Sequence, residues 1–283
     1  MNIIDIVSKQ TTSKFSGDKE RFLKKFQQLY HLEILHPSLN LIVSKCKNNQ
    51  VNFVIEPLKN WDRCVGHCQT KGFFGKIGDM FSRKLTHIIN IKTVECDIIM
   101  HEMAHAVEKS SGIDLNGDFR KVLGNDMRNR FSNNLQVASA VENVMKNELK
   151  SYKLNNIMEE LFARYFEMIA MSYEVGGFSR YQFKYNDIIN YFENTTLWVK
   201  EYFNPLISKL IDGEVEKASK IFVENLEPYK KSWADDVKST HYNYDENGKK
   251  NWASGTKSTN RWIGLANALN NSSIGYDKNK KIE

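Results

Sequence analysis

The stretch DIIMHEMAHAVEKSSG, residues 97–112, contains the pattern H-E-x-x-H at His101, Glu102 and His105. Apolar residues recur around this pattern at helical spacing, no proline interrupts it, and the stretch ends on a glycine, a residue that commonly terminates helices. Thr93 is suited to cap the start. The sequence therefore predicts one helix that carries all three residues of the pattern.

Two histidines four residues apart lie on one face of a helix, so the imidazoles of His101 and His105 can bind a single metal ion. Glu102 is displaced from that face, but it can hydrogen-bond a water held on the ion and act as general base. Zinc with three protein ligands keeps a fourth position for water and lowers the pKa of that water toward about 7, which favours hydrolysis. The alternative is a surface helix that carries the pattern incidentally.

A third ligand has to come from another part of the chain, because the next histidine after the motif is His241. An apolar stretch over residues 155–177 is predicted to be a buried helix, and it contains three glutamates: Glu159, Glu160 and Glu167. A buried carboxylate is unfavourable unless it is paired or bound to metal. The first of these can complete a capping box, and the last can pair with Arg164 or Lys184. Glu160 has no such local partner and is the preferred ligand.

H-E-x-x-H followed by a glutamate on a later helix resembles the gluzincin metallopeptidases. The strings HEMAHAVE and ELFARYF, within residues 86–174, resemble the catalytic domain of anthrax lethal factor and its relatives. The resemblance implies a zincin-like fold in which His101, His105 and Glu160 bind one zinc ion per chain and Glu102 is the general base. Residues outside this range are not covered by it.

The chain departs from the family pattern at three places. Ala104 stands where the family has a glycine, and Arg164 stands where it has a glutamate, so a supporting carboxylate at that position is in doubt. The family also has a tyrosine that assists the oxyanion just before the third ligand, and Tyr152 is the nearest match, off by one residue. Aligning Tyr152 with that tyrosine would select Glu159 as the ligand instead of Glu160.

The rest of the chain predicts an α+β fold that is predominantly helical. Helices are predicted over residues 18–31, 117–152, 186–203 and 206–227, and strands over residues 51–57 and 86–92. Interruptions are expected near Gly124 and at Pro205. The strand over residues 86–92, THIINIK, directly precedes the motif helix and is expected to be a sheet edge against which an extended peptide can pair.

With 41% of its 283 residues hydrophobic, the chain can bury a full core in one large domain or two small ones. We expect one zincin-like metallopeptidase domain over residues 1–227, with its core over about residues 50–227. Residues 228–283 form a basic tail rich in Ser, Asn, Gly and Lys. This tail carries three of the five tryptophans, Trp233, Trp252 and Trp262. We therefore expect parts of it to be ordered.

Four cysteines are too few for a disulfide scaffold in a chain of this length, so reduced thiols are predicted. Cys64, His67 and Cys68 have the spacing of half a metal knuckle. No second Cys/His pair at zinc-finger spacing accompanies them, and buried or loop thiols are the preferred interpretation.

No apolar run approaches the roughly 20 residues of a membrane span, and the N-terminal residues lack secretory-signal features. A cytoplasmic protein, or one exported without a signal peptide, is expected. The net charge of +6 comes without a nucleic-acid-binding motif, so no nucleic-acid partner is expected.

The leading hypothesis is a zinc metalloendopeptidase that acts on a protein or peptide substrate. A catalytically inactive zincin-fold binding module, or a secreted effector that acts by protein interaction, is the second hypothesis. A basic nucleic-acid-associated protein with an incidental H-E-x-x-H is the third.

Overall fold

The computed structural model describes residues 2–56, 66–73, 84–128, 157–174 and 185–227, together with residues 242–244 and 250–252. These residues form a predominantly helical α+β fold with one mixed sheet of four strands and a separate pair of short strands, β5 (Tyr242–Tyr244) and β6 (Lys250–Trp252). The predicted α+β class is confirmed at this level. Within the described part of the chain, no helix is both long enough and apolar enough to cross a membrane.

The four-stranded sheet has the order β1-β2-β4-β3. Its strands are β1 (Thr11–Ser13), β2 (Val51–Ile55), β3 (Gly66–Phe73) and β4 (Lys84–Ile91). The first, second and fourth of these run parallel, and β3 runs antiparallel to β4. Alternate residues of β2 and β4 are buried on one face, among them the paired Phe53 and Ile89. That face forms part of the core.

The strand predicted over residues 86–92 corresponds to β4, but its expected position at the sheet edge is wrong. β4 lies between β2 and β3, and β3 forms the edge on that side of the described sheet. The sequence of β3, GHCQTKGF, contains two glycines and few apolar residues, so hydrophobic alternation gives no strand signal there. Its pairing with β4 along its whole length makes it a strand.

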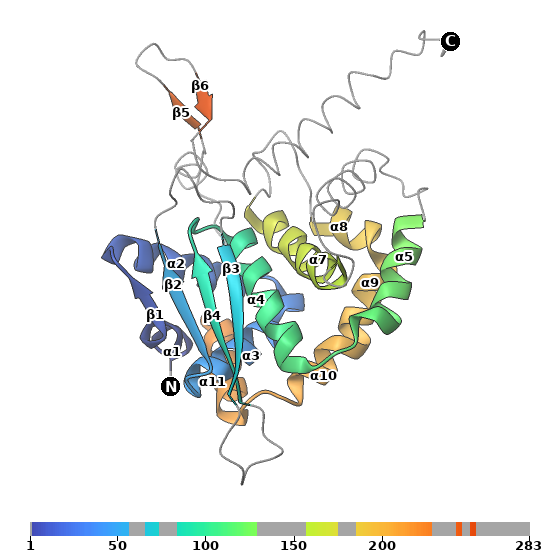
Figure 1. Cartoon of the computed structure of the whole chain (residues 1–283), viewed down its shortest axis with the longest axis horizontal. Helices are drawn as coiled ribbons and strands as arrows, with labels where there is room; N and C mark the ends of the chain where they lie inside the picture. The colour runs from blue at the N-terminus through green and yellow to red at the C-terminus, as the bar shows by residue number, and fades with distance from the viewer. Residues whose placement is uncertain are drawn as a thin grey trace.

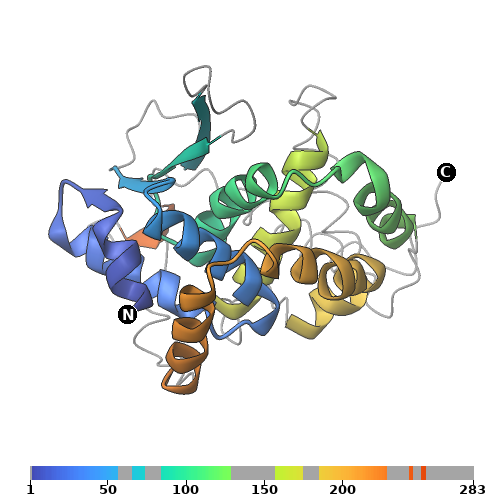
Figure 2. The same cartoon turned by 90° about the horizontal axis from the view of Figure 1, so that it is seen from below.

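Helices surround one face and one end of this sheet. They are α1 (Ile3–Lys9), α2 (Ser16–Leu29), α3 (His36–Lys47), α4 (Cys96–Ser111), α5 (Arg120–Arg128), α7 (Ile157–Glu174), α8 (Tyr185–Tyr191), α9 (Glu193–Trp198), α10 (Asn204–Ser208) and α11 (Gly213–Glu224), with helical turns at Glu33–Leu35, Leu115–Phe119 and Val199–Phe203. Helices α2, α3 and α4 pack against the sheet, and α4 lies between the sheet and α7 (Figures 1 and 2). The Phe22 ring of α2 and the Phe53 ring of β2 have centroids 4.8 Å apart, so sheet and helices share one core.

Helix α7 is buried on nearly every side, as its apolar composition predicts. Every residue from Leu161 to Met171 is buried. The ring centroid of Phe162 lies 5.3 Å from that of Phe119 and 5.2 Å from that of Phe203. A helix packed in this way cannot rotate freely, so the side chains of its first turn have defined positions.

The start of α4 differs from the prediction. The helix begins at Cys96, and its N-terminal flanking residue is Glu95 in an extended conformation, not Thr93. The Glu95 carboxylate forms ion pairs with Arg21 and Lys25 of α2, an interaction that the local sequence of α4 does not reveal. The other end agrees with the prediction, because the terminal glycine has a left-handed conformation with φ of 64°.

Two expected interruptions also differ. Helix α5 continues through Gly124. No break occurs at Pro205, because proline is tolerated in the first turn of a helix and Pro205 occupies that turn in α10. The breaks lie at Phe192 and between Ser208 and Gly213.

Candidate metal centre

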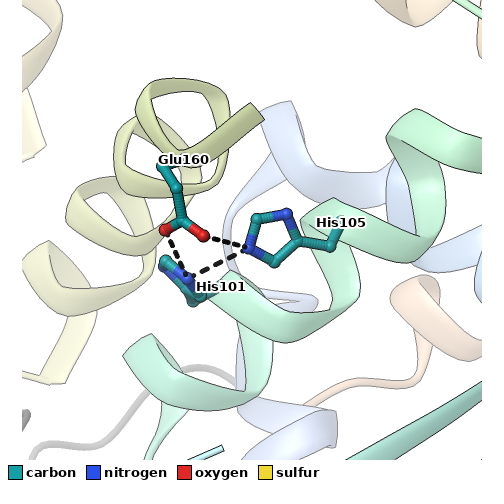
Figure 3. Close-up of side chains that lie close together, drawn as sticks. All are labelled: His101, His105 and Glu160. Atoms are coloured by element: carbon teal, nitrogen blue, oxygen red, sulfur yellow. Dashed lines mark hydrogen bonds and ion pairs between the residues drawn. The ribbon is translucent and has the colours of Figure 1, made fainter. Parts of the chain in front are cut away.

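Two neighbouring helices bring the predicted metal ligands together. Helix α4 presents His101 and His105 one turn apart, and α7 presents Glu160 in its first turn. The two helices lie side by side, with α4 backed by the sheet (Figure 1). The three side chains point toward a common position between the helices (Figure 3).

The distances between these three side chains are short. The Nε2 atoms of His101 and His105 are 3.3 Å apart. Glu160 Oε2 lies 3.6 Å from His101 Nε2, and Glu160 Oε1 lies 3.6 Å from His105 Nε2. One ligand atom from each residue lies within 4.8 Å of the other two. Two imidazole nitrogens and a carboxylate oxygen in this arrangement can hold a metal ion.

Two further properties of the group fit a cation. Burial lowers the pKa of His105 well below its usual value, and the charge of a protonated His101 would lower it further, so the His105 imidazole is neutral and able to act as a ligand. Glu160 Oε2 is buried and has no hydrogen-bond partner among the described residues. A buried carboxylate oxygen without a partner is unfavourable unless a positive charge faces it.

Glu102 lies beside this group but outside it, against Gly66 at the start of β3. Its side chain is buried, and burial raises the pKa of Glu102 to about 7, although His101 acts in the opposite direction. Glu102 Oε2 also has no hydrogen-bond partner among the described residues. A carboxyl group with a pKa near neutrality can both take up and release a proton at physiological pH.

Glu159, the competing candidate for third ligand, has a different partner. Its Oε1 atom lies 2.5 Å from the Lys109 ammonium, which is also 3.3 Å from Glu108 Oε2. The structure therefore brings Glu160, and not Glu159, to the two histidines. The residues before position 157, which include the rest of the expected capping box, lie outside the described residues.

Glu167 has a role that the sequence reasoning missed. Its expected pairing with Arg164 is present, with the Arg164 Nη1 atom donating to both carboxylate oxygens at 2.8 and 3.1 Å. In addition, Glu167 Oε2 lies 2.7 Å from His101 Nδ1. The signal in the sequence is the spacing, because a residue seven positions after Glu160 lies on nearly the same helix face.

The remaining sequence candidates do not join the site. Tyr152 and Cys64 lie outside the described residues. His67 and Cys68 are adjacent in β3, so their side chains point to opposite faces, and His67 Nε2 lies 3.1 Å from Asn90 Nδ2. The three cysteines described, Cys46, Cys68 and Cys96, are free thiols, as predicted.

Comparisons with protein-family models, with curated proteins and with solved structures found no match. The geometry shows three side chains that could hold a metal ion, with a buried carboxyl group beside them.

Proposed function

We propose that this protein is a zinc metallopeptidase of the gluzincin type that hydrolyses peptide bonds of a protein substrate. The observation that carries the proposal is the convergence of His101, His105 and Glu160, with the buried Glu102 next to them. The order of the elements supports it too, because a small sheet is followed by the motif helix and then by a glutamate-bearing helix, which is the order expected for a zincin-like fold. The resemblance to the lethal factor family points to the same residues.

Zinc is the metal we propose, because two imidazoles and one carboxylate are a ligand set typical of catalytic zinc sites. When bound, zinc supplies Lewis-acid chemistry: it lowers the pKa of water and polarises a carbonyl oxygen. His101 and His105 would hold it from α4, and Glu160 from α7.

Glu102 performs the proton transfers in this proposal. Its carboxylate takes a proton from the water that attacks the peptide carbonyl carbon, and the carboxylic acid then gives that proton to the departing amine nitrogen as the C–N bond breaks. Both steps need a group that is comparably stable in its charged and neutral forms. Burial raises the pKa of Glu102 and so favours its neutral form, whereas a bound cation would favour the charged form.

Strand β3 is the element proposed to hold the substrate. It is one of the two edges of the described sheet, it starts at the contact with Glu102, and its outer backbone groups can pair with an extended peptide. Such pairing uses main-chain hydrogen bonds and is independent of side-chain identity. The pairing with substrate that was expected at β4 is therefore proposed for β3 instead.

The proposal is tested by metal analysis and by cleavage of a peptide library followed by mass spectrometry. The wild-type protein should contain one zinc per chain and cut peptides. Glu102→Gln should keep the zinc and lose cleavage by several orders of magnitude, because an amide cannot take the proton. Glu108→Gln is the matched control, since Glu108 is buried on the same helix but lies outside the metal group.

The outcomes separate the hypotheses. Zinc without cleavage in the wild-type protein would replace the peptidase with an inactive zincin-fold binding module. If the purified protein is free of zinc and does not take it up, both the zinc metallopeptidase and the inactive zincin-fold binding module are excluded. Cleavage that survives Glu102→Gln at wild-type rates would leave a metal enzyme with a different base.

A further inference from the structure

We infer that Glu167, held in place by Arg164, is a positioning residue that fixes the tautomer of His101 and so directs its Nε2 lone pair to the metal centre. The consequence for metal binding rests on the proposed function. The tautomer itself is a property of the metal-free protein and can be tested separately.

The tautomer follows from the partners of the two ring nitrogens. His101 Nδ1 lies 2.7 Å from Glu167 Oε2, and an ionised carboxylate can only accept hydrogen bonds, so Nδ1 carries the hydrogen. A neutral imidazole has one ring proton, which leaves Nε2 with its lone pair. That Nε2 atom is the one that faces Glu160 and His105 at 3.6 and 3.3 Å. The nitrogen needed for metal binding is therefore the one that the Glu167 contact leaves unprotonated.

Arg164 explains how Glu167 can remain an acceptor at this depth. Both side chains are almost completely buried, with 3% and 2% of Arg164 and Glu167 exposed. A buried carboxyl group on its own tends to become neutral, and a protonated carboxyl group could donate to Nδ1 and reverse the tautomer. The guanidinium group is always charged, and its two hydrogen bonds stabilise the ionised carboxylate. The pair carries no net charge, so it orients His101 without adding a negative charge to the centre.

The contact between His101 and Glu167 is a second link between α4 and α7, in addition to the contact between His101 and Glu160. Glu160 and Glu167 are both on α7, and His101 on α4 contacts one through each of its ring nitrogens. Hydrogen bonds to the far nitrogen of a histidine ligand commonly change metal affinity by about 10- to 100-fold. We expect an effect of this size for loss of the Glu167 acceptor.

The first test is the tautomer of His101 in metal-free protein labelled with ¹⁵N-histidine. Two-bond ¹H–¹⁵N correlations distinguish a protonated Nδ1 from a protonated Nε2. We expect the Nδ1–H form in the wild-type protein, with His105 free to donate its own Nε2–H to His101 Nε2. An Nε2–H tautomer at His101 would overturn the inference without any variant.

The second test uses variants that keep the buried charge balanced. The double variant Arg164→Met/Glu167→Met removes the acceptor together with its cation, and it should lose the Nδ1–H form and bind zinc about 10- to 100-fold more weakly. Arg164→Met/Glu167→Gln returns one neutral acceptor oxygen and should restore both properties toward wild type. Glu159→Gln is the control, because Glu159 lies on the same helix and contacts Lys109.

The outcomes keep this inference apart from the proposed function. If the wild-type protein does not bind zinc, the proposed function fails, and the tautomer measurement still decides the positioning role. If the wild-type protein binds zinc and the methionine variant, folded by circular dichroism, keeps both the tautomer and the affinity, the positioning role fails alone. A methionine variant that does not fold leaves the decision to the wild-type tautomer.

Discussion

Replacing Gly66 by alanine would place a methyl group against the proposed general base. A Cβ atom at this position would lie 2.8 Å from Glu102 Oε1, 2.9 Å from Glu102 Cγ and 3.1 Å from the backbone oxygen of Asn90. Ordinary contacts between such atoms are about 3.5–4.0 Å, so the neighbours must move by roughly half an ångström or more. The Asn90 oxygen belongs to the backbone of β4, so the Glu102 side chain is the part expected to yield.

The size of the effect follows from this overlap. Overfilling a packed site destabilises a protein by about 1–3 kcal/mol. A displacement of a catalytic group by about 1 Å can lower the rate about 100-fold, and we expect peptide cleavage by Gly66→Ala to fall to that extent or less. Zinc content should stay at the wild-type value, because Gly66 does not belong to the metal group.

The assay compares Gly66→Ala with Gly17→Ala for peptide cleavage, zinc content and thermal unfolding. Gly17 is the control because a Cβ added there meets no described atom within 4 Å. Its variant should cleave at the wild-type rate and be as stable as the wild-type protein or slightly more stable. If Gly66→Ala cleaves peptides as fast as the control, Glu102 is not the base or does not depend on its contact with β3.

Three further predictions concern single side chains. Glu160→Ala should weaken zinc binding at least tenfold in a competition titration, whereas Glu159→Ala should leave it unchanged; the reverse order would exchange their roles. Burial lowers the pKa of His87 to about 4, so the folded protein keeps His87 neutral while the unfolded chain takes up a proton below about pH 6.5. The wild-type protein should therefore lose about 2 kcal/mol more stability than His87→Gln between pH 7 and pH 5, measured by urea unfolding, and equal losses would contradict this. Asp126 accepts hydrogen bonds from the backbone and side chains of the first residues of α9, so Asp126→Ala should lower the free energy of unfolding by about 3 kcal/mol, and a change near zero would show that water replaces it.

The sequence predicts the two ligand helices because their signals are local. Helical spacing of apolar residues and a terminal glycine indicate α4, and apolar residues on nearly every side of the predicted helix indicate that α7 is buried. The spacing of Glu160 and Glu167 places both on nearly the same face of α7, but no local signal shows that Glu167 contacts His101. This contact depends on how α4 and α7 lie against each other, which is a property of the packed core. The same packing determines that Glu160, rather than the adjacent Glu159, faces the histidines, since adjacent helical residues point about 100° apart.

The order of the strands in the sheet could not be predicted from the sequence. β4 is recognisable from its isoleucines, but a strand composition does not say how many neighbours the strand has. Its edge position is excluded by β3, whose glycines and polar residues resemble a loop when read alone. The Glu95 ion pairs likewise join residues 70 or more positions apart, so they could not be predicted from the sequence around α4.

If the proposed zinc ion binds, the division of its three ligands between α4 and α7 couples metal binding to folding. In the unfolded chain Glu160 is separated from the two histidines by more than 50 residues, so the complete ligand set exists only in the native state. An ion that binds only the native state adds about 2.7 kcal/mol to the free energy of unfolding when its free concentration is 100 times its dissociation constant. A chelator would therefore lower the melting temperature even if the native conformation stayed the same. In a cell, the survival time of the chain against degradation would then depend on the metal supply.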